Sequence, residues 1–359
     1  MWIGKESSVV TGAIRILSGG RNSRGAHASY GLYSSMPSFA VALVAGRFED
    51  MDSRIRCHTR ILILNFNGAK DTINCIKSLK GDPLLLDEQV LVIDNASTDG
   101  SVDQIQSEFP RIRVQVNRTN LGYAGGMNSA ISKVLSEGVE SILILNNDTI
   151  VHPGVVGLLN RTLQQFQDFG IVGPAVLDAG SDKVQSQGID IDWIRGRSPG
   201  RYSGRRYDDV PHCVQDVDFV SGCAMLVKRE VFERVGLFPS NFFLYGEETD
   251  LCLRAKRSGF RVVCDSRAVV EHGVGSTVNR YPGLQAFYST RNRFLVTKRH
   301  GSIGQFVAFS LWTMLFELPR FSLGVVVKRL PLSVMYSKAV GVFEGLRCSL
   351  SESRIVCER

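Results

Sequence analysis

Three carboxylates fall within four residues in the second half of the chain. Glu247, Glu248 and Asp250 follow the aromatic run FFLYG and precede helix-forming residues that end at Gly259. The simplest interpretation is an acidic first turn that complements the helix dipole. Carboxylates beside apolar surface can also have raised pKa values, which suits a general base. A base needs a substrate, so the surrounding chain decides between these two interpretations.

The polar run Asn146-Asn147-Asp148 supplies a second candidate group. It follows the apolar residues ILIL, and Asp148 can place a carboxylate on a divalent cation. Mg²⁺ and Mn²⁺ prefer hard oxygen ligands and take one or two carboxylates from a protein, with diphosphate oxygens completing the shell. An Asn/Asp turn is the alternative. His272, downstream of the acid cluster, can complete a Mn²⁺ shell, although a lone histidine is more often structural.

Two further loops can contact a nucleotide. Asp94-Asn95 ends an apolar run and can bind the base edge or the ribose, although Asp and Asn also serve often as helix caps and turns. The Gly-rich loop 120–128 brings backbone amides to the start of a helix, where glycine permits close approach to a diphosphate. A plain glycine turn is the alternative. The loop matches neither G-x-G-x-x-G nor a P-loop, so a Rossmann dehydrogenase and a P-loop NTPase are not supported.

Apolar runs that alternate with helical patterns must position these groups. Strands are predicted at 61–66, 90–93, 112–116, 141–148, 170–177, 217–227 and 261–264. Helical segments separate the first four strands, which indicates an α/β fold with a mainly parallel central sheet flanked by helices. In such sheets ligands bind at the carboxyl ends of the strands, where Asp94, Asn146 and Asp148 lie.

The composition restricts the partners. The 359 residues carry a net charge of +7 with a pI near 9.0, which favours nucleotides, phosphate groups or an anionic membrane surface. No basic helix with interleaved aromatic residues is present in the sequence, so no nucleic-acid partner is expected. None of the eight cysteines forms a C-x-x-C pair, and several lie in apolar runs, which suits reduced thiols in the cytoplasm.

The two ends of the chain differ from its middle. Residues 1–57 are rich in Gly, Ser and Arg, which predicts a disordered or spurious leader before a folded domain at 58–300. The tail 301–359 combines apolar and basic residues, but its longest apolar stretch is too short for a membrane span. Such a tail can lie on an anionic membrane. A core helix with a solvated basic face is the alternative.

Eight sequence blocks together resemble the family 2 glycosyltransferases, specifically their rhamnosyltransferase-like branch. In order, the blocks are ILILNFNG, VLVIDNASTDGS, NLGYAGGMNSAI, ILILNNDT, FVSGCAMLVKREVFERVGLF, FFLYGEETDLCLRAKRSGF, VVEHGVGST and STRNRFL. Each block is weak by itself, but eight blocks in the family's order, spread over residues 60–300, are specific. The resemblance implies the GT-A fold of nucleotide-diphospho-sugar transferases.

The resemblance also assigns roles to individual residues. The family usually has Glu-Asp where this chain has Glu247-Glu248, and the second position is generally assigned as the base. The resemblance therefore implies that Glu248 is the catalytic base, with Glu247 the runner-up. Asp148 matches the metal ligand of the family's D-x-D-type motif, and His272 matches its downstream metal-binding histidine. The residues implied to line the nucleotide-sugar site are Asn67, Asp94, Asn95, Gly122, Asn128, Asn146, Asp250 and Arg291.

The implied activity is an inverting, metal-dependent sugar transfer. The donor would be dTDP-rhamnose or a UDP-hexose, and the cofactor Mg²⁺ or Mn²⁺. The acceptor would be a hydroxyl of a glycan or of a lipid-linked acceptor in cell-surface polysaccharide synthesis, which places the protein in the cytoplasm at the inner face of the cell membrane. The alternative is a non-catalytic nucleotide-sugar-binding scaffold of a glycan-assembly complex, because Glu248 and Asn146 each replace an aspartate that the family usually has.

Overall fold

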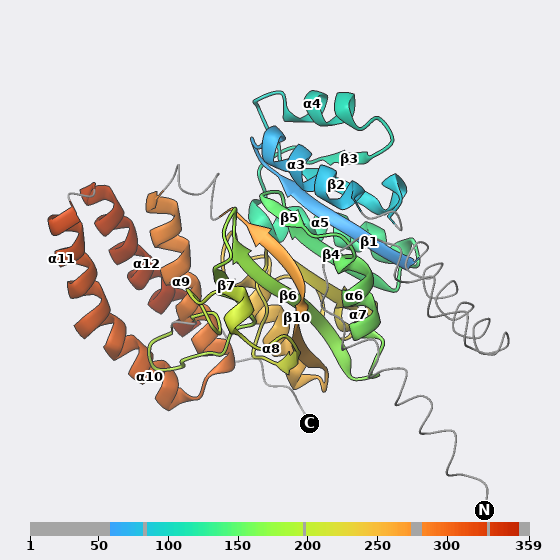
Figure 1. The fold of residues 1–359 in the computed structure, drawn as a ribbon. Helices are drawn as coiled ribbons and strands as arrows, with labels where there is room; N and C mark the ends of the chain where they lie inside the picture. The colour runs from blue at the N-terminus through green and yellow to red at the C-terminus, as the bar shows by residue number, and fades with distance from the viewer. Residues whose placement is uncertain (1–57, 82–84, 197–198, 274–281, 329–330, 352–359) are drawn as a thin grey trace, which may run out of the picture. The chain divides into compact units, whose positions relative to one another are not determined.

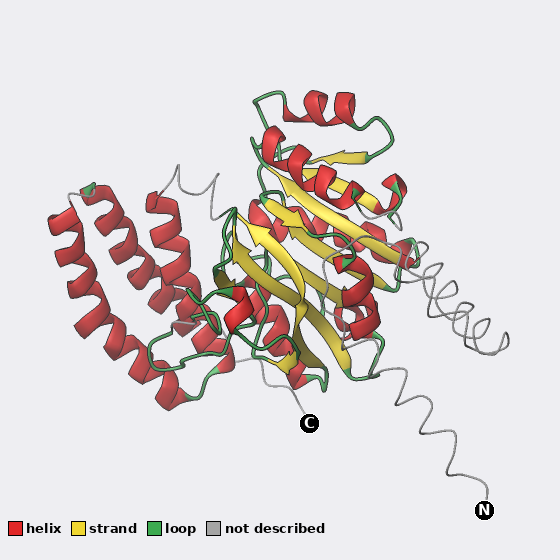
Figure 2. Ribbon diagram, in the orientation of Figure 1, coloured by secondary structure: helices red, strands yellow, loops and turns green. Residues whose placement is uncertain are grey.

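The computed structural model describes residues 58–81, 85–196, 199–273, 282–328 and 331–351. Figure 1 shows their elements in chain order, and Figure 2 separates the helices from the strands. The predicted leader, residues 1–57, lies outside the described residues. The domain boundary predicted at residue 300 stays a prediction.

The first half alternates strands with helices, as the sequence predicts. Its elements are β1 (Thr59–Asn65), α3 (Ala69–Lys80), β2 (Val90–Asp94), α4 (Ser101–Glu108), β3 (Arg113–Val116), α5 (Gly122–Ser136), β4 (Ser141–Asn146), β5 (Thr149–Val151) and α6 (Val155–Leu163). The predicted strand 141–148 ends two residues early, because the chain turns at Asn147-Asp148 before it enters β5.

The second half contains the two longest strands and the two longest helices that the structure describes. Its elements are β6 (Phe169–Asp178), β7 (Val184–Ser186), β8 (Val214–Asp216), β9 (Ala224–Lys228), α7 (Arg229–Val235), α8 (Glu247–Arg257), β10 (Arg261–His272), α9 (Pro282–His300), α10 (Ile303–Trp312), a π-helical turn (Thr313–Glu317), α11 (Leu318–Lys328) and α12 (Leu332–Ser351). The predicted strand 217–227 is wrong over its first part. The Asp218 carboxylate binds the Ile191 N–H at 3.0 Å, and the chain turns at Gly222-Cys223 before β9 begins.

The central sheet has the order β3-β2-β1-β4-β9-β6-β10-β5. β3, β2, β1 and β4 are parallel, as predicted, and so are β6 and β10. β9 lies between these groups and is antiparallel to both neighbours, so the predicted mainly parallel sheet also contains antiparallel pairs. Asn65 pairs in register with Asp94, and Leu64 pairs with Asn146. This register brings the polar strand ends to one edge of the sheet.

Buried apolar side chains on the two faces of the sheet form two cores. Alternate residues of one strand point to opposite faces, so Leu62 joins the core that contains α5 and α8, while Ile61 and Ile63 join the core that contains α3 and α6. All three side chains are fully buried. Strands buried on both faces explain the continuous apolar runs in the sequence.

α12 packs between α9 and α11, as Figure 1 shows, and α10 also contacts α9. α12 can lie close to α9 because Gly345 has no side chain, and a Cβ at this position would come within 2.8 Å of Phe294. Along the residues that the structure describes, we find no helix long and apolar enough to cross a membrane.

Candidate active site

The carboxyl ends of β1 and β2 are joined by a polar network. Asp94 is fully buried, and its carboxylate accepts hydrogen bonds from Asn65 Nδ2 (2.7 Å) and from the Ser97 N–H (2.9 Å). Asn67 Oδ1 accepts a bond from the Thr98 N–H at 2.8 Å. These hydrogen bonds connect the loop after β1 to the loop after β2. Asn67 is partly exposed at the sheet edge, whereas Asp94 is the buried acceptor of the network.

Asn95 and Gly122 fix the Gly-rich loop. Asn95 is buried, and its Nδ2 donates to Asn120 Oδ1 and to the Gly122 carbonyl, both at 2.9 Å. Gly122 has a φ of +70°, and a Cβ there would lie 2.3 Å from the Phe243 carbonyl oxygen. Only glycine fits this close approach, which packs the loop directly on the segment that precedes the acid cluster.

Asn128 is not brought to the sheet edge as an open polar group. Its Nδ2 donates to the Phe238 carbonyl at 2.8 Å, and its Oδ1 accepts the Phe238 N–H at 3.1 Å. Both ends of the amide are thus occupied by one buried backbone segment. Asn128 fastens α5 to the chain leading to α8, and its predicted sugar contact stays a prediction.

Asp148 and His272 meet at the sheet edge, as expected of two ligands of one cation. Asp148 Oδ1 lies 3.2 Å from His272 Nε2, and Asn146 Nδ2 lies 3.4 Å from the same nitrogen. Asp148 and His272 come together because β10 is antiparallel to β5, with His272 opposite Thr149. Both side chains are largely buried, at 12% and 16% exposure.

Gln185 orients His272 and was not predicted from the sequence. Its Oε1 lies 3.2 Å from His272 Nδ1, and its Nε2 donates to the His272 carbonyl at 2.9 Å. When Nδ1 carries the proton and donates to Gln185, the lone pair on Nε2 faces Asp148. Metal-binding histidines commonly have such a second partner.

The donor set around Asp148 fits a hard divalent cation. Asn146 Oδ1 is buried and has no hydrogen-bond partner among the described residues, which is unusual for an amide oxygen. The described residues contain no cluster of three or more His, Cys, Asp or Glu that could hold a metal by themselves. Asp148, His272 and Asn146 would therefore hold a cation together with ligand oxygens and water, as Mg²⁺ and Mn²⁺ sites often do.

The two glutamates at the start of α8 have different surroundings. Glu248 is partly exposed and lines a cavity of about 1040 Å³, whereas Glu247 is 4% exposed and outside that lining. Burial raises the pKa of Glu248, although backbone N–H groups and Thr249 lower it in part. Burial and the neighbouring Glu248 also raise the pKa of Glu247. Of the two glutamates, Glu248 is therefore the one whose side chain lines the cavity.

Asp250 is held away from the cavity. It is fully buried, and its carboxylate contacts Arg254 Nε at 2.7 Å, His300 Nε2 at 2.8 Å and Arg299 Nη1 at 3.4 Å. Burial would raise the pKa of Asp250, but the bond from His300 and the charge of Arg254 lower it to about 2. Arg254 belongs to α8 itself, whereas Arg299 and His300 join α8 to α9, and the structure does not bring Asp250 to the predicted nucleotide-sugar site.

Arg291 contacts the loop before α8 rather than the cavity. Its Nη1 donates to the Asn241 carbonyl at 3.0 Å and to Asn292 Oδ1 at 2.8 Å. Asn292 does line the cavity, and its Nδ2 donates to the carbonyls of Leu244 (2.9 Å) and Tyr245 (2.7 Å). The Arg-Asn pair therefore shapes the entry to α8.

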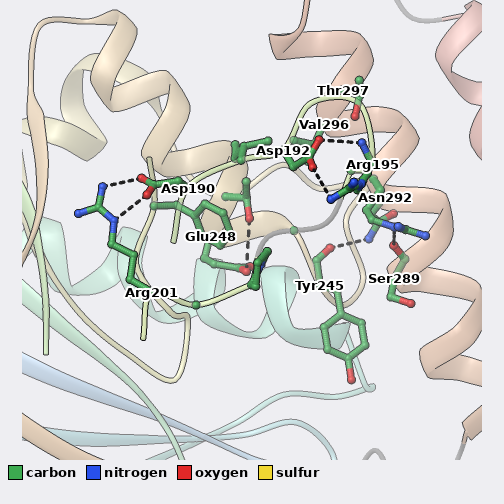
Figure 3. Close-up of a pocket in the computed structure, with 18 residues that line it drawn as sticks. Asp190, Asp192, Arg195, Arg201, Tyr245, Glu248, Ser289, Asn292, Val296 and Thr297 are labelled. Atoms are coloured by element: carbon green, nitrogen blue, oxygen red, sulfur yellow. Dashed lines mark hydrogen bonds and ion pairs between the residues drawn. The ribbon is translucent and has the colours of Figure 1, made fainter. Parts of the chain in front are cut away.

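The cavity beside Glu248 has two other walls. One is formed by residues from 190–196 and 199–201, and the other is α9. Figure 3 shows Glu248 between the Asp190–Arg201 ion pair, whose Oδ2–Nε distance is 2.6 Å, and the side chains of α9. The polar lining residues that sequence reasoning missed include Asp190, Asp192, Arg195, Arg201, Ser289 and Arg293. The concentration of Gly and Arg in 195–206 was the available signal.

The turn at Gly222-Cys223 links the candidate metal ligands to Glu248. The Cys223 carbonyl accepts the Asn146 N–H at 2.9 Å, and a Cβ at Gly222 would lie 3.4 Å from Glu248 Cγ. Tyr123, from the Gly-rich loop, donates to the Gly222 carbonyl at 2.9 Å. One short turn thus brings the sheet edge, the Gly-rich loop and the cavity into contact.

The sequence matches a family model described as "Glycosyl transferase family 2" over residues 60–236. A protein of Mycobacterium bovis, "Uncharacterized protein Mb1552", is 31% identical over 206 residues, which are 55% of this chain and 69% of that protein. The "N-acetylglucosaminyl-diphospho-decaprenol L-rhamnosyltransferase" of Mycobacterium tuberculosis is 26% identical over 233 residues, 59% of this chain and 76% of that protein.

Further similarities extend the comparison. The "Low-salt glycan biosynthesis hexosyltransferase Agl10" of Haloferax volcanii is 26% identical over 245 residues, covering 66% of this chain and 74% of that protein. Among solved structures, the mannosyltransferase PcManGT from Pyrobaculum calidifontis, in complex with GDP-Man and Mn²⁺, aligns with a TM-score of 0.47 at 13% identity. That alignment covers 87% of this chain and 98% of the other.

Proposed function

Because the chain belongs to the family 2 glycosyltransferases and has the GT-A fold, we propose an inverting transfer with Glu248 as the base. The donor is a nucleotide-diphosphate sugar, dTDP-rhamnose or a UDP-hexose. The acceptor is a hydroxyl of a glycan or a lipid-linked acceptor in cell-surface polysaccharide synthesis. The observation that carries the proposal is the position of Glu248, a carboxylate with a raised pKa in the wall of a cavity of about 1040 Å³.

Glu248 would take the proton of the acceptor hydroxyl. As the O–H bond breaks toward the carboxylate, the acceptor oxygen forms a bond to the anomeric carbon, and the bond from that carbon to the diphosphate breaks. Attack from the face opposite the diphosphate inverts the configuration. A raised pKa suits this role because it makes the carboxylate a stronger base near neutral pH.

The donor side would be the sheet edge with the Gly-rich loop. Asn67 would contact the base or ribose, and Gly122 would let the loop approach the diphosphate. Asp148, His272 and Asn146 would hold Mg²⁺ or Mn²⁺, which when bound stabilises negative charge on the departing diphosphate. Gln185 acts as a positioning residue, because it keeps the His272 Nε2 lone pair directed at this site.

We also propose that the protein works in the cytoplasm in peripheral contact with the inner face of the membrane. The described cysteines Cys75, Cys213, Cys223, Cys252, Cys264 and Cys348 are all unpaired thiols, which suits a reducing compartment. A lipid-linked acceptor would then be reached at the membrane surface.

A donor panel tests the proposed activity. The full-length protein is mixed with dTDP-rhamnose, UDP-glucose, UDP-galactose or GDP-mannose, with Mn²⁺, Mg²⁺ or EDTA, and both thermal stabilisation and nucleoside diphosphate release are measured. We expect one donor to raise the Tm and to release diphosphate, with EDTA reducing both effects. Stabilisation by a donor without any release, in the presence of varied acceptors, would instead support a binding scaffold.

A further inference from the structure

The helix that runs from α10 through the π-helical turn into α11 exposes an unusual number of large apolar side chains. Exposure reaches 68% for Ile303, 63% for Leu315 and 65% for Leu323. We call these side chains the apolar face: Ile303, Val307, Leu311, Met314, Leu315, Phe316 and Leu323. Four of them recur every four residues, so they share one side of the helix. Large exposed apolar side chains gathered on one side of a helix mark an interaction site more often than a solvated surface.

The opposite side of the same helix contains a buried carboxylate. Glu317 is 6% exposed, and it contacts Arg293 Nη2 at 2.7 Å and Lys338 Nζ at 2.8 Å. Burial would raise the pKa of Glu317, but its bonds to Arg293 and Lys338 lower it to about 2. The neighbouring Leu315 and Phe316 point outward instead. A charge that is buried and paired beside exposed apolar residues reverses the pattern expected for a helix facing water.

Packing fixes this orientation. Phe309 is fully buried, and its ring centroid lies 4.7 Å from that of Phe294 on α9. With Phe309 and Glu317 both held against α9 and α12, the apolar face cannot rotate into the protein without breaking these contacts. Its exposure is therefore set by the fold.

The charge around the apolar face points to an anionic surface. Between Glu271 and Glu344 the sequence holds a single carboxylate, Glu317, and nine Lys and Arg residues. Of these nine, Arg293, Arg299 and Lys338 are ion-paired within the protein. Because Glu317 is buried, no described carboxylate of this stretch faces solvent, whereas Arg320 is exposed. Docking on a neutral apolar protein would not require a surface without exposed carboxylates and with an exposed arginine, whereas docking on anionic lipid would.

We propose that the apolar face and Arg320 dock on an anionic membrane, with the helix lying in the plane of the interface. No described helix is long and apolar enough to span a bilayer, so contact along one face is the fitting geometry. This inference refines the membrane contact proposed above and holds whether or not sugar transfer takes place.

The docking helix also touches the walls of the cavity. Arg293 lines the cavity and pairs with Glu317, and the Arg195 guanidinium lies 5.5 Å from the Trp312 ring centroid. Docking on lipid therefore places the cavity beside Glu248 close to the membrane surface. An acceptor carried on a lipid would reach the base from that side.

Vesicle flotation tests the proposal with the full-length protein. We expect binding to phosphatidylcholine vesicles that contain about one third phosphatidylglycerol, with weaker binding to pure phosphatidylcholine and at high salt. The double variant Leu311→Asp/Leu315→Asp should lose at least about tenfold in the fraction bound. The matched control, Leu86→Asp/Phe166→Asp, changes two exposed apolar residues elsewhere and should bind as the wild type does.

Folding and oligomeric state are checked on the same samples. Both double variants should keep the wild-type Tm and the donor-induced Tm shift, which separates lipid binding from the proposed transfer reaction. If Leu311→Asp/Leu315→Asp does not fold, quenching of Trp312 fluorescence by brominated lipid in the wild type, compared with Trp312→Phe, replaces it. Wild-type protein that ignores anionic vesicles, unchanged binding of the double variant, or a wild-type dimer that this variant dissociates would overturn the proposal.

Discussion

The first turn of α8 holds two carboxylates, Glu248 and Asp250, whose surroundings shift their pKa values in opposite directions. Glu248 lines the cavity, and burial raises its pKa, whereas Asp250 is enclosed by Arg254, Arg299 and His300. The hydrogen bond from His300 and the charge of Arg254 lower the pKa of Asp250 to about 2. The two residues are only two positions apart on one helix. The comparison teaches that surroundings rather than residue type separate a candidate base from a structural anion.

The largest effect should come from Glu248→Gln. The amide keeps the shape of the side chain but cannot take a proton, so the turnover number should fall by about 10²–10⁴. Donor affinity should stay within about threefold of the wild type, because the change lies on the acceptor side. Steady-state transfer assays and donor titrations measure the two quantities.

Glu247→Gln is the matched control for that variant. Glu247 is buried with a raised pKa and does not line the cavity, so its neutral isostere should leave turnover within about threefold. A large loss for Glu247→Gln together with normal turnover for Glu248→Gln would reverse the assignment.

Asp250→Asn should reduce stability instead of chemistry. Removing a buried charge leaves its cationic partners uncompensated, so the free energy of unfolding should fall by roughly 2–4 kcal/mol. Urea unfolding measures the change. Asp103→Asn, an exposed acid in the first turn of α4, should change it by less than about 0.5 kcal/mol.

The loss of stability in Asp250→Asn should depend on pH, because the pKa of Asp250 is lowered in the folded state. The folded-state pKa of Asp250 is depressed, so its contribution is complete above the ordinary value of 3.8 and is lost as the pH falls through about 2. The difference in the free energy of unfolding between the wild type and Asp250→Asn should therefore become smaller as the pH falls from 3.8 to about 2. A difference that stays constant down to pH 2 would argue against the ion-paired state.

Gln185→Ala should have a smaller effect, confined to the metal side. Without the hydrogen bond from Nδ1 to Gln185, the His272 ring is no longer oriented with Nε2 toward Asp148. The Mn²⁺ affinity should therefore fall about 10–100-fold. Mn²⁺ binding in the presence of a nucleoside diphosphate, followed by electron paramagnetic resonance, measures this without relying on activity. The exposed Gln165→Ala is the control, and equal affinities in both variants would remove Gln185 from the site.

Much of the fold could be predicted because its signals are local. Continuous apolar runs that stop at polar residues identified β1, β2 and β4, and parallel pairing then required Asp94 and Asn146 to lie at one edge. The antiparallel position of β9 between β4 and β6 has no such signal. The position of β9 depends on the turn at Gly222-Cys223, and this turn could not be recognised because it lies within a largely apolar run of residues.

The candidate site was predictable only where its residues have recognisable types. Asp148, His272 and Glu248 stand out as carboxylates or a histidine after apolar runs. The partners of Asp250 include His300, fifty positions away on α9, and Gln185 meets His272 across eighty-seven positions. Such contacts depend on tertiary packing, so composition and spacing could not reveal them.

Chemical rescue tests the central claim, that Glu248 takes the proton of the acceptor. Transfer by Glu248→Ala and by Glu247→Ala is measured at saturating donor with and without formate, a carboxylate small enough to enter the emptied space. We expect formate to raise the rate of Glu248→Ala by at least about tenfold and to leave Glu247→Ala unchanged. A rate for Glu248→Ala close to that of the wild type without formate, or rescue confined to Glu247→Ala, would contradict it.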